Sequence, residues 1–366
     1  MENSKVNFKL MKQIFIHFLF LSSPILLLGQ QRTDYNNLDN WESNCYCSTN
    51  NSLHPSSIVH ADNNWQLLLA LKGGLTLKQL DSLKISYTQS QLLLLRSQRL
   101  LNKTQNIYTT AIPILDTEQT ANLRKQSQLV ANGIYAEIKK ECSDLVSHLS
   151  EQGRSHNAFS ILFSYVFDGL VWKRFEKEGI VKERNGTGIW SGNYWFLIPK
   201  RPFQCGTNWV PSGEFVFKFN WSYTENITEN LLDKDFKVLF PLVQGNKSDK
   251  TIVDEFSPFG FFDKNLNLTI PVIDEKENNT LCLLSNRITD KLLPTFLAKT
   301  DIETLKSVYT FSNNSETVVI FYHEVMWDLM NLLVERQIIV MPTAFQYPDK
   351  ATLKDAADLC FIVKLE

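Results

Sequence analysis

Five polar side chains are candidates for chemistry, because each lies in a segment that is otherwise rich in apolar or aromatic residues. They are Asp168, Cys205, His323, Glu324 and Asp328. A buried carboxylate such as Asp168 needs hydrogen bonds or a cation, and it can show the raised pKa that marks functional sites. The simpler expectation is structural: a helix packs closely at Gly169, and Asp168 forms a hydrogen bond across it.

Cys205 belongs to the string Gln204-Cys205-Gly206-Thr207-Asn208-Trp209. This string resembles the papain-type pattern, in which a Cys-Gly pair precedes a Cys-Trp pair and the second cysteine is the nucleophile. Asn208 stands in the nucleophile's place, and an amide cannot form a thiolate. The sequence therefore favours a buried structural thiol or a disulfide at Cys205 over a cysteine peptidase.

His323 and Glu324 have the order that opens a zinc-protease helix, but Trp327 stands where the second histidine is required. Glu324 and Asp328 share a helical face and could hold one arm of a metal site. The sequence supplies no further ligand for that arm, and it has no glycine-rich phosphate loop and no Gly-x-Ser-x-Gly elbow. We therefore predict no metal and no cofactor, and expect these side chains to bond to neighbouring groups.

The six cysteines are Cys45, Cys47, Cys142, Cys205, Cys282 and Cys360. An even number of cysteines in an oxidising compartment permits disulfides. Because the last four are widely scattered in a chain too long to need stapling, free buried thiols are an equal expectation for them. Cys45 and Cys47 are separated by one residue, which is less than the usual spacing of zinc-binding cysteines.

The N-terminus has the order of a secretory signal. Three lysines and one acidic residue precede an apolar run over residues 14–28, which ends at Gly29. The run is shorter than the roughly 20 residues that span a bilayer, so we predict cleavage near Gln30 and an exported protein, periplasmic or extracellular. An uncleaved anchor is the alternative. The leader resembles the signal peptides of Bacteroidota.

The composition argues against nucleic acid as a partner. The chain has 37 basic and 39 acidic residues, and removing residues 1–29 takes away three basic and one acidic residue, which leaves a net charge near −4. No cationic excess remains to attract phosphates. Because no later apolar run reaches membrane-spanning length, we predict no transmembrane segment in the mature chain, and expect an unidentified protein or envelope component as partner.

Residues 62–112 predict three short helices followed by a hairpin. Asn102-Lys103-Thr104-Gln105-Asn106 form its polar tip. This layout resembles the winged helix-turn-helix superfamily, and an unrelated small helical bundle is the alternative. The third helix contains the four consecutive leucines of residues 92–95, which predict burial, whereas helices that read a DNA groove expose polar and basic side chains.

An internal duplication is predicted by two similar strings 158 residues apart, Ile112-Pro113-Ile114-Leu115-Asp116 and Ile270-Pro271-Val272-Ile273-Asp274. Each string predicts the end of a strand, because its proline interrupts the hydrogen bonds of the sheet and its aspartate can cap the helix that follows. The same shift pairs Phe163 with Phe321. It also relates the predicted helices 158–177 and 317–336, which are apolar nearly all round and should be buried.

We therefore predict a mainly α fold with small antiparallel β elements (α+β), built from a winged-helix-like domain and duplicated helical units. The predicted segments are a signal peptide (1–29), a polar linker (30–61), the winged-helix-like domain (62–112), a helical unit (113–187), a β-rich, aromatic-rich segment (188–270), a second helical unit (271–345) and a C-terminal tail (346–366).

The sequence does not specify a function. It favours a non-enzymatic exported binding or scaffold protein, because it contains an export signal and no complete catalytic set. An envelope hydrolase with its site in residues 188–270 is one alternative. A DNA-binding regulator is the other, and it requires the leader to be an uncleaved anchor. Ligand, reaction, oligomeric state and disulfide pairing stay open.

Overall fold

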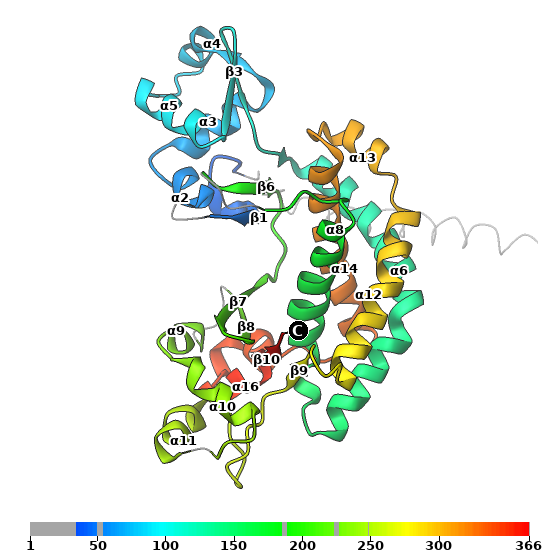
Figure 1. The fold of residues 1–366 in the computed structure, drawn as a ribbon. Helices are drawn as coiled ribbons and strands as arrows, with labels where there is room; N and C mark the ends of the chain where they lie inside the picture. The colour runs from blue at the N-terminus through cyan, green and yellow to red at the C-terminus, as the bar shows by residue number, and fades with distance from the viewer. Residues whose placement is uncertain (1–33, 50–53, 185–188, 223–226, 248, 366) are drawn as a thin grey trace, which may run out of the picture.

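The computed structural model describes residues 34–49, 54–184, 189–222, 227–247 and 249–365. The predicted leader and its cleavage point lie outside these residues. In the described residues the chain is mainly helical with small antiparallel and mixed sheets, which confirms the α+β class. Figure 1 shows a layer of long helices with two smaller lobes stacked on one side of it.

The helical layer is formed by the longest helices of the chain. Its members are α6 (Thr117–Glu151), α7 (Ala158–Ser160), the π-helical segment η4 (Ile161–Leu170), α8 (Val171–Lys177), α12 (Thr280–Lys299), α13 (Ile302–Tyr309) and α14 (Asn314–Glu335). Helix α6 packs against both α12 and α14. Asp116 and Gln119 form a capping box at the start of α6, which satisfies backbone N–H groups that have no partner inside the helix.

Helix α14 is the one described helix that is long and apolar enough to cross a membrane, and most of its apolar stretch is buried inside the protein. It therefore packs as a core helix. The expected helix 158–177 is also present, with a wider π-helical middle in η4.

The upper lobe contains short helices and a three-stranded sheet. Its elements are α2 (Pro55–Val59), α3 (Asn64–Ala70), β2 (Leu75–Thr76), α4 (Leu77–Ser82), α5 (Gln89–Ser97), β3 (Leu101–Thr104) and β4 (Ile107–Thr110), with the strand order β2-β4-β3. Leu92 and Leu95 are buried, but Leu93 and Leu94 are exposed. The expected burial of all four leucines was wrong, because only residues three or four apart share a helical face.

A second sheet joins the upper lobe to the helical layer. Strand β6 (Ser191–Leu197) pairs antiparallel with β1 (Glu42–Ser48) and parallel with β5 (Ile114–Leu115). Successive side chains of a strand point to opposite faces, so Tyr194 and Phe196 enter the core of the upper lobe, whereas Trp195 and Leu197 enter the main core. Strand β6 therefore lies between two hydrophobic cores.

The lower lobe contains a four-stranded sheet in the order β7-β8-β10-β9. Its elements are β7 (Cys205–Ser212), β8 (Phe215–Ser222), α9 (Ile227–Leu232), α10 (Phe240–Val243), α11 (Lys250–Phe256), β9 (Val272–Asp274), α15 (Thr343–Gln346), α16 (Ala356–Leu359) and β10 (Cys360–Lys364). The stacked rings of Phe217 and Phe236, 3.8 Å apart, help to fill its core.

Two segments for which we predicted no regular element contain strands, β1 at the edge of one sheet and β10 in the middle of another. The polar linker includes β1, and the C-terminal tail includes β10, which is buried between β8 and β9. Both strands are short and find their partners far away in the sequence. Their local composition therefore gave little indication that they would be ordered.

The two Ile-Pro strings differ at the start of the helices that follow them. Asp116 caps α6, as predicted, but Asp274 does not cap α12. Its carboxylate accepts a hydrogen bond from the Glu277 amide within a tight turn, and Asn279 caps α12 instead. The two prolines also precede short parallel strands and do not stop them.

Phe163 and Phe321 are both buried in the main core, where Phe163 lies 5.3 Å from Trp327 and Phe321 lies 6.2 Å from Phe296 between ring centres. We expect Phe163→Ala and Phe321→Ala each to lower the free energy of unfolding by about 3–5 kcal/mol, because truncation leaves a cavity. Urea unfolding measures the loss. Leu129→Ala, at an exposed position of α6, is the control and should change stability by less than about 0.5 kcal/mol. A loss no larger than the control's would contradict this packing.

Candidate functional site

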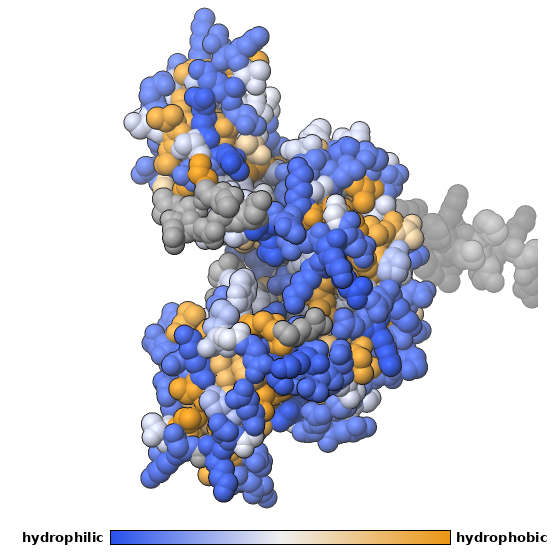
Figure 2. Space-filling view, viewed as in Figure 1, coloured by the Kyte–Doolittle hydropathy of each residue, from blue (hydrophilic) through white to orange (hydrophobic). Residues whose placement is uncertain are grey.

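A pocket of about 260 Å³ lies between β1, β7 and α14, and Asp168, Cys205 and His323 all contribute to its lining. The strands that border it belong to the two lobes, and Figure 2 shows the surface notched between those lobes. The structure thus brings together three of the five residues that the sequence singled out. Glu324 and Asp328 belong to a separate set of contacts.

Asp168 is held by two hydrogen bonds at the end of the π-helical segment. Trp172 Nε1 and Thr207 Oγ1 donate to its two carboxylate oxygens, each at 3.1 Å. Burial raises the pKa of Asp168 to about 6, although nearby Lys218 favours its ionised form. Burial also lowers the pKa of Lys218 to about 8.

The expected close helix crossing at Gly169 was wrong. The nearest group from another element is the Lys218 side chain of β8, 3.7 Å from the place of an added Cβ. A strand therefore covers this side of η4, and Asp168 bonds to strand β7 and to its own helix. Helices with π-type turns are frequently found at functional sites.

Cys205 lies buried at the start of β7, and burial raises the pKa of its thiol well above the ordinary value. A thiol with a raised pKa is protonated at neutral pH and is a poor nucleophile. The structure thus offers no thiolate at Cys205. Among the described residues, which include all six cysteines, no disulfide is formed, and the last four cysteines are buried.

His323 lies between two tryptophan rings at the inner end of the pocket. Its ring centre is 5.2 Å from that of Trp195 and 6.3 Å from that of Trp327. Burial lowers the pKa of His323 to about 4, so the imidazole is neutral at physiological pH. Its Nδ1 has no hydrogen-bond partner among the described residues.

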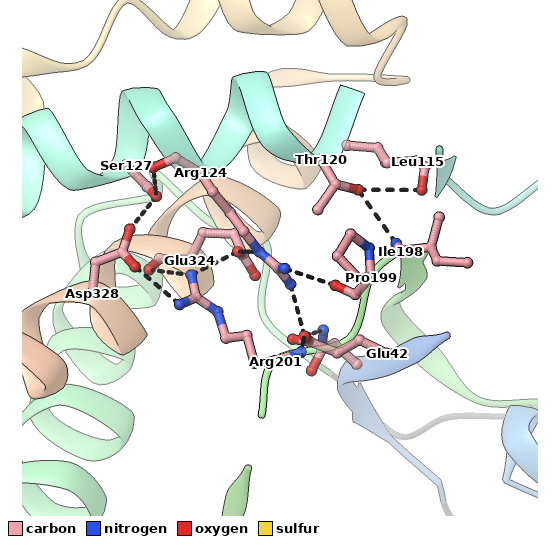
Figure 3. A network of polar contacts seen from close by, with 11 residues as sticks. Glu42, Leu115, Thr120, Arg124, Ser127, Ile198, Pro199, Arg201, Glu324 and Asp328 are labelled. Atoms are coloured by element: carbon pink, nitrogen blue, oxygen red, sulfur yellow. Dashed lines mark hydrogen bonds and ion pairs between the residues drawn. The ribbon is translucent and has the colours of Figure 1, made fainter. Parts of the chain in front are cut away.

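Glu324 and Asp328 are held by two arginines and are not free to bind a metal (Figure 3). Glu324 Oε2 accepts from Arg124 Nε and from Arg201 Nη2, both at 2.8 Å. Asp328 Oδ1 accepts from Arg201 Nη1 at 2.9 Å, and Ser127 donates to its other oxygen. Their shared helical face therefore forms ion pairs with two arginines.

Glu42 of β1 completes this buried set of charges, which is called here the charge cluster: Glu42, Arg124, Arg201, Glu324 and Asp328. The Glu42 carboxylate accepts from Arg124 Nη2 and from the Arg201 backbone amide, both at 2.8 Å. Burial raises the pKa of Glu42. Burial would also raise the pKa of Glu324, but Arg201 and Arg124 lower it below its ordinary value.

No sequence pattern pointed to Glu42 or Arg124, or to Asn44 and Tyr46 of β1 at the pocket. Cys45 and Cys47 line the pocket, and the Arg184 guanidinium lies 3.9 Å from the centre of the Tyr46 ring. A hydrogen bond from Cys47 lowers the pKa of Cys45 to about 5. An isolated Cys-x-Cys pair in a polar segment was the one signal available, and it gave no partner.

Comparison of the chain with protein-family models, with curated proteins and with solved structures gave no match. The assignment of a function therefore depends on the geometry of the pocket and of the residues around it.

The pocket predicts a specific pH dependence of stability. The pKa of His323 falls from its ordinary 6.5 to about 4 on folding, so the unfolded chain binds a proton that the folded chain does not. The free energy of unfolding is therefore unaffected by His323 above pH 6.5 and falls as the pH is lowered towards 4. The loss is at most about 3 kcal/mol, and partial exposure of the ring makes it smaller.

His323→Phe keeps a ring in place but cannot be protonated. Urea unfolding between pH 4 and 7 should therefore show a shallower loss of stability in this variant than in the wild type. An identical pH dependence in the two proteins would show that His323 is not a buried neutral imidazole.

Proposed function

We propose that this chain is an exported, non-enzymatic binding protein that holds a saccharide in the pocket between β1 and β7. The observation that carries the proposal is the gathering of aromatic and hydrogen-bonding side chains from distant parts of the chain. Trp209 and Trp221 meet Asn44, Gln204 and residues of α14 around one cavity. Pockets that bind small molecules combine apolar walls with a few polar groups in this way.

A sugar ring has apolar C–H faces and a rim of hydroxyl groups, and the pocket offers both kinds of contact. Trp209 lies at the pocket with 62% of its surface exposed, so its indole face is available for stacking. Asn44, Gln204 and Arg184 supply donors and acceptors for hydroxyl groups. Among the described residues of the lining, Arg184 is the one cationic side chain, which favours a neutral ligand over a phosphate.

The hydrolase alternative depends on Asp168, because a pKa of about 6 suits a general acid. Hydrolysis of a glycosidic bond ordinarily needs two carboxylates on opposite sides of the bond. Asp168 is the one carboxylate in the described lining of the pocket, and it already accepts two hydrogen bonds. Binding without hydrolysis therefore fits the pocket better.

We infer that the upper lobe is winged-helix-like. Three of its helices, α3, α4 and α5, precede the β3–β4 hairpin, and β2 completes the sheet. Leu93 and Leu94 are exposed on α5, the helix that would read DNA. Apolar side chains at these positions favour contact with protein over contact with a DNA groove.

We also infer that the chain is duplicated, and the sheets support this. Strands β5 and β9 each follow a proline and pair in parallel with a strand, β6 or β10, that also has an antiparallel partner. In the first half, the Phe196 amide donates to the Pro113 carbonyl at 2.9 Å. In the second, the Ile362 amide donates to the Pro271 carbonyl at the same distance.

The ends of the two core helices support the same shift of 158 residues. The Ile180 amide donates to the Phe175 carbonyl, and the Ile338 amide donates to the Leu333 carbonyl, both at 2.9 Å. Gly179 and Gln337, at equivalent positions, have the positive φ values of 69° and 58°. In this architecture the pocket forms where the strands of the two halves converge.

The proposal predicts that Trp209→Ala weakens saccharide binding by about tenfold, equivalent to about 1.4 kcal/mol, through loss of the stacking face. The probes are neutral oligosaccharides of glucose, galactose, mannose and N-acetylglucosamine, and isothermal titration calorimetry measures their binding. Tyr347→Ala removes an exposed aromatic ring outside the pocket and should leave the affinity unchanged. Absence of binding to every probe by the wild type, or equal affinities in the two variants, would contradict the proposal.

A further inference from the structure

Two cysteines of β1 and one histidine gather at the edge of the pocket. Cys45, Cys47 and His54 each offer a donor atom, and these three atoms lie within 4.8 Å of one another. We propose that Cys45, Cys47 and His54 bind a zinc ion. This inference is independent of saccharide binding, because it rests on a donor set that the proposed ligand contacts do not include.

The pairing of β1 with β6 places the two thiols on one side of the strand. Residues two apart in a strand share a face, so Cys45 and Cys47 both point away from Glu42 and Asn44. Gly192 of β6 lies opposite Cys47, and an added Cβ there would lie 2.9 Å from Cys47 Cα. Because Gly192 has no Cβ and adopts a φ of +110°, β6 can approach β1 closely at Cys47.

The separation of the donors fits tetrahedral zinc. Bonds of about 2.3 Å to sulfur and about 2.0–2.1 Å to nitrogen, at a tetrahedral angle, place the two ligand atoms roughly 3.6 Å apart. Cys47 Sγ and His54 Nε2 lie 3.5 Å apart. A zinc ion could thus bind both atoms with little movement of either side chain.

The other nitrogen of His54 has a partner that suits a metal ligand. Nδ1 lies 2.6 Å from the Ser56 hydroxyl, to which an Nδ1–H group can donate while Nε2 remains free for the metal. Nδ1 also lies 3.2 Å from the Ser56 amide. That longer contact holds only in the other tautomer and is given up when zinc binds.

The charges and the open coordination position are also consistent with zinc. Two thiolates and one neutral imidazole neutralise Zn²⁺, and soft thiolate ligands favour it over Mg²⁺ or Ca²⁺. Three protein ligands leave a fourth position, as in zinc sites that bind water or an exogenous group. Cys45 and Cys47 also border the pocket between β1 and β7.

The test is cobalt and zinc binding to the purified full-length chain with its thiols reduced. We expect one Co²⁺ per chain, a thiolate-to-cobalt charge-transfer absorption and displacement of cobalt by Zn²⁺. Cys47→Ser should abolish the absorption. His54→Gln should weaken Zn²⁺ binding by more than the roughly 10–100-fold that loss of an outer-shell partner costs. His60→Gln changes an exposed histidine outside the cluster and should leave binding unchanged.

Cys45→Ser, at an exposed position, provides a second ligand variant whose unfolding midpoint should match that of the wild type. The proposal is overturned if reduced protein gives no charge-transfer absorption, or if the absorption persists in the ligand variants. It is also overturned if peptide mapping of the natively produced protein shows a Cys45–Cys47 disulfide in place of bound metal.

Discussion

Two partly buried arginines hold three buried carboxylates at the point where β1, α6, the segment after β6 and α14 meet. Removing charges from water is costly, and only close, well-oriented pairs offset that cost. Here Arg124 bridges Glu42 and Glu324, and Arg201 bridges Glu324 and Asp328, with nitrogen–oxygen distances of 2.8–2.9 Å. Four segments far apart in the sequence must therefore adopt one relative position.

In two of these segments, β1 and α14, the residues next to the charge cluster line the pocket. In β1, Glu42 joins the charge cluster, whereas residues 43–47 border the pocket. In α14, Glu324 joins the cluster while His323 and Trp327 line the pocket. A change in the charge cluster would therefore move β1 and α14, which both border the pocket. The packing of these charges and the proposed binding of a saccharide thus depend on the same backbone segments.

The sequence predicted those features that depend on local pattern. The α+β class, the Asp116 cap and the buried core helices follow from apolar periodicity and capping chemistry, and unusual polar residues led to Asp168, Cys205 and His323 at the pocket. Features that depend on distant partners were not predictable from local pattern. Strands β1 and β10, the partners of Glu324, and the meeting of His54 with Cys47 all require pairing that only the complete fold reveals.

The charge cluster fixes β1 against α6, and a double-mutant cycle on Glu42 and Arg124 tests this constraint most directly. Arg124→Met should lower the free energy of unfolding by roughly 3–5 kcal/mol, because it leaves the buried Glu42 carboxylate without its ion-pair partner. Glu42→Gln should lower it by less, because Arg124 keeps its ion pair with Glu324. The double variant should lose less than the sum by more than about 1 kcal/mol. Additive losses, within about 0.5 kcal/mol, would show that the two side chains do not interact and would contradict the account.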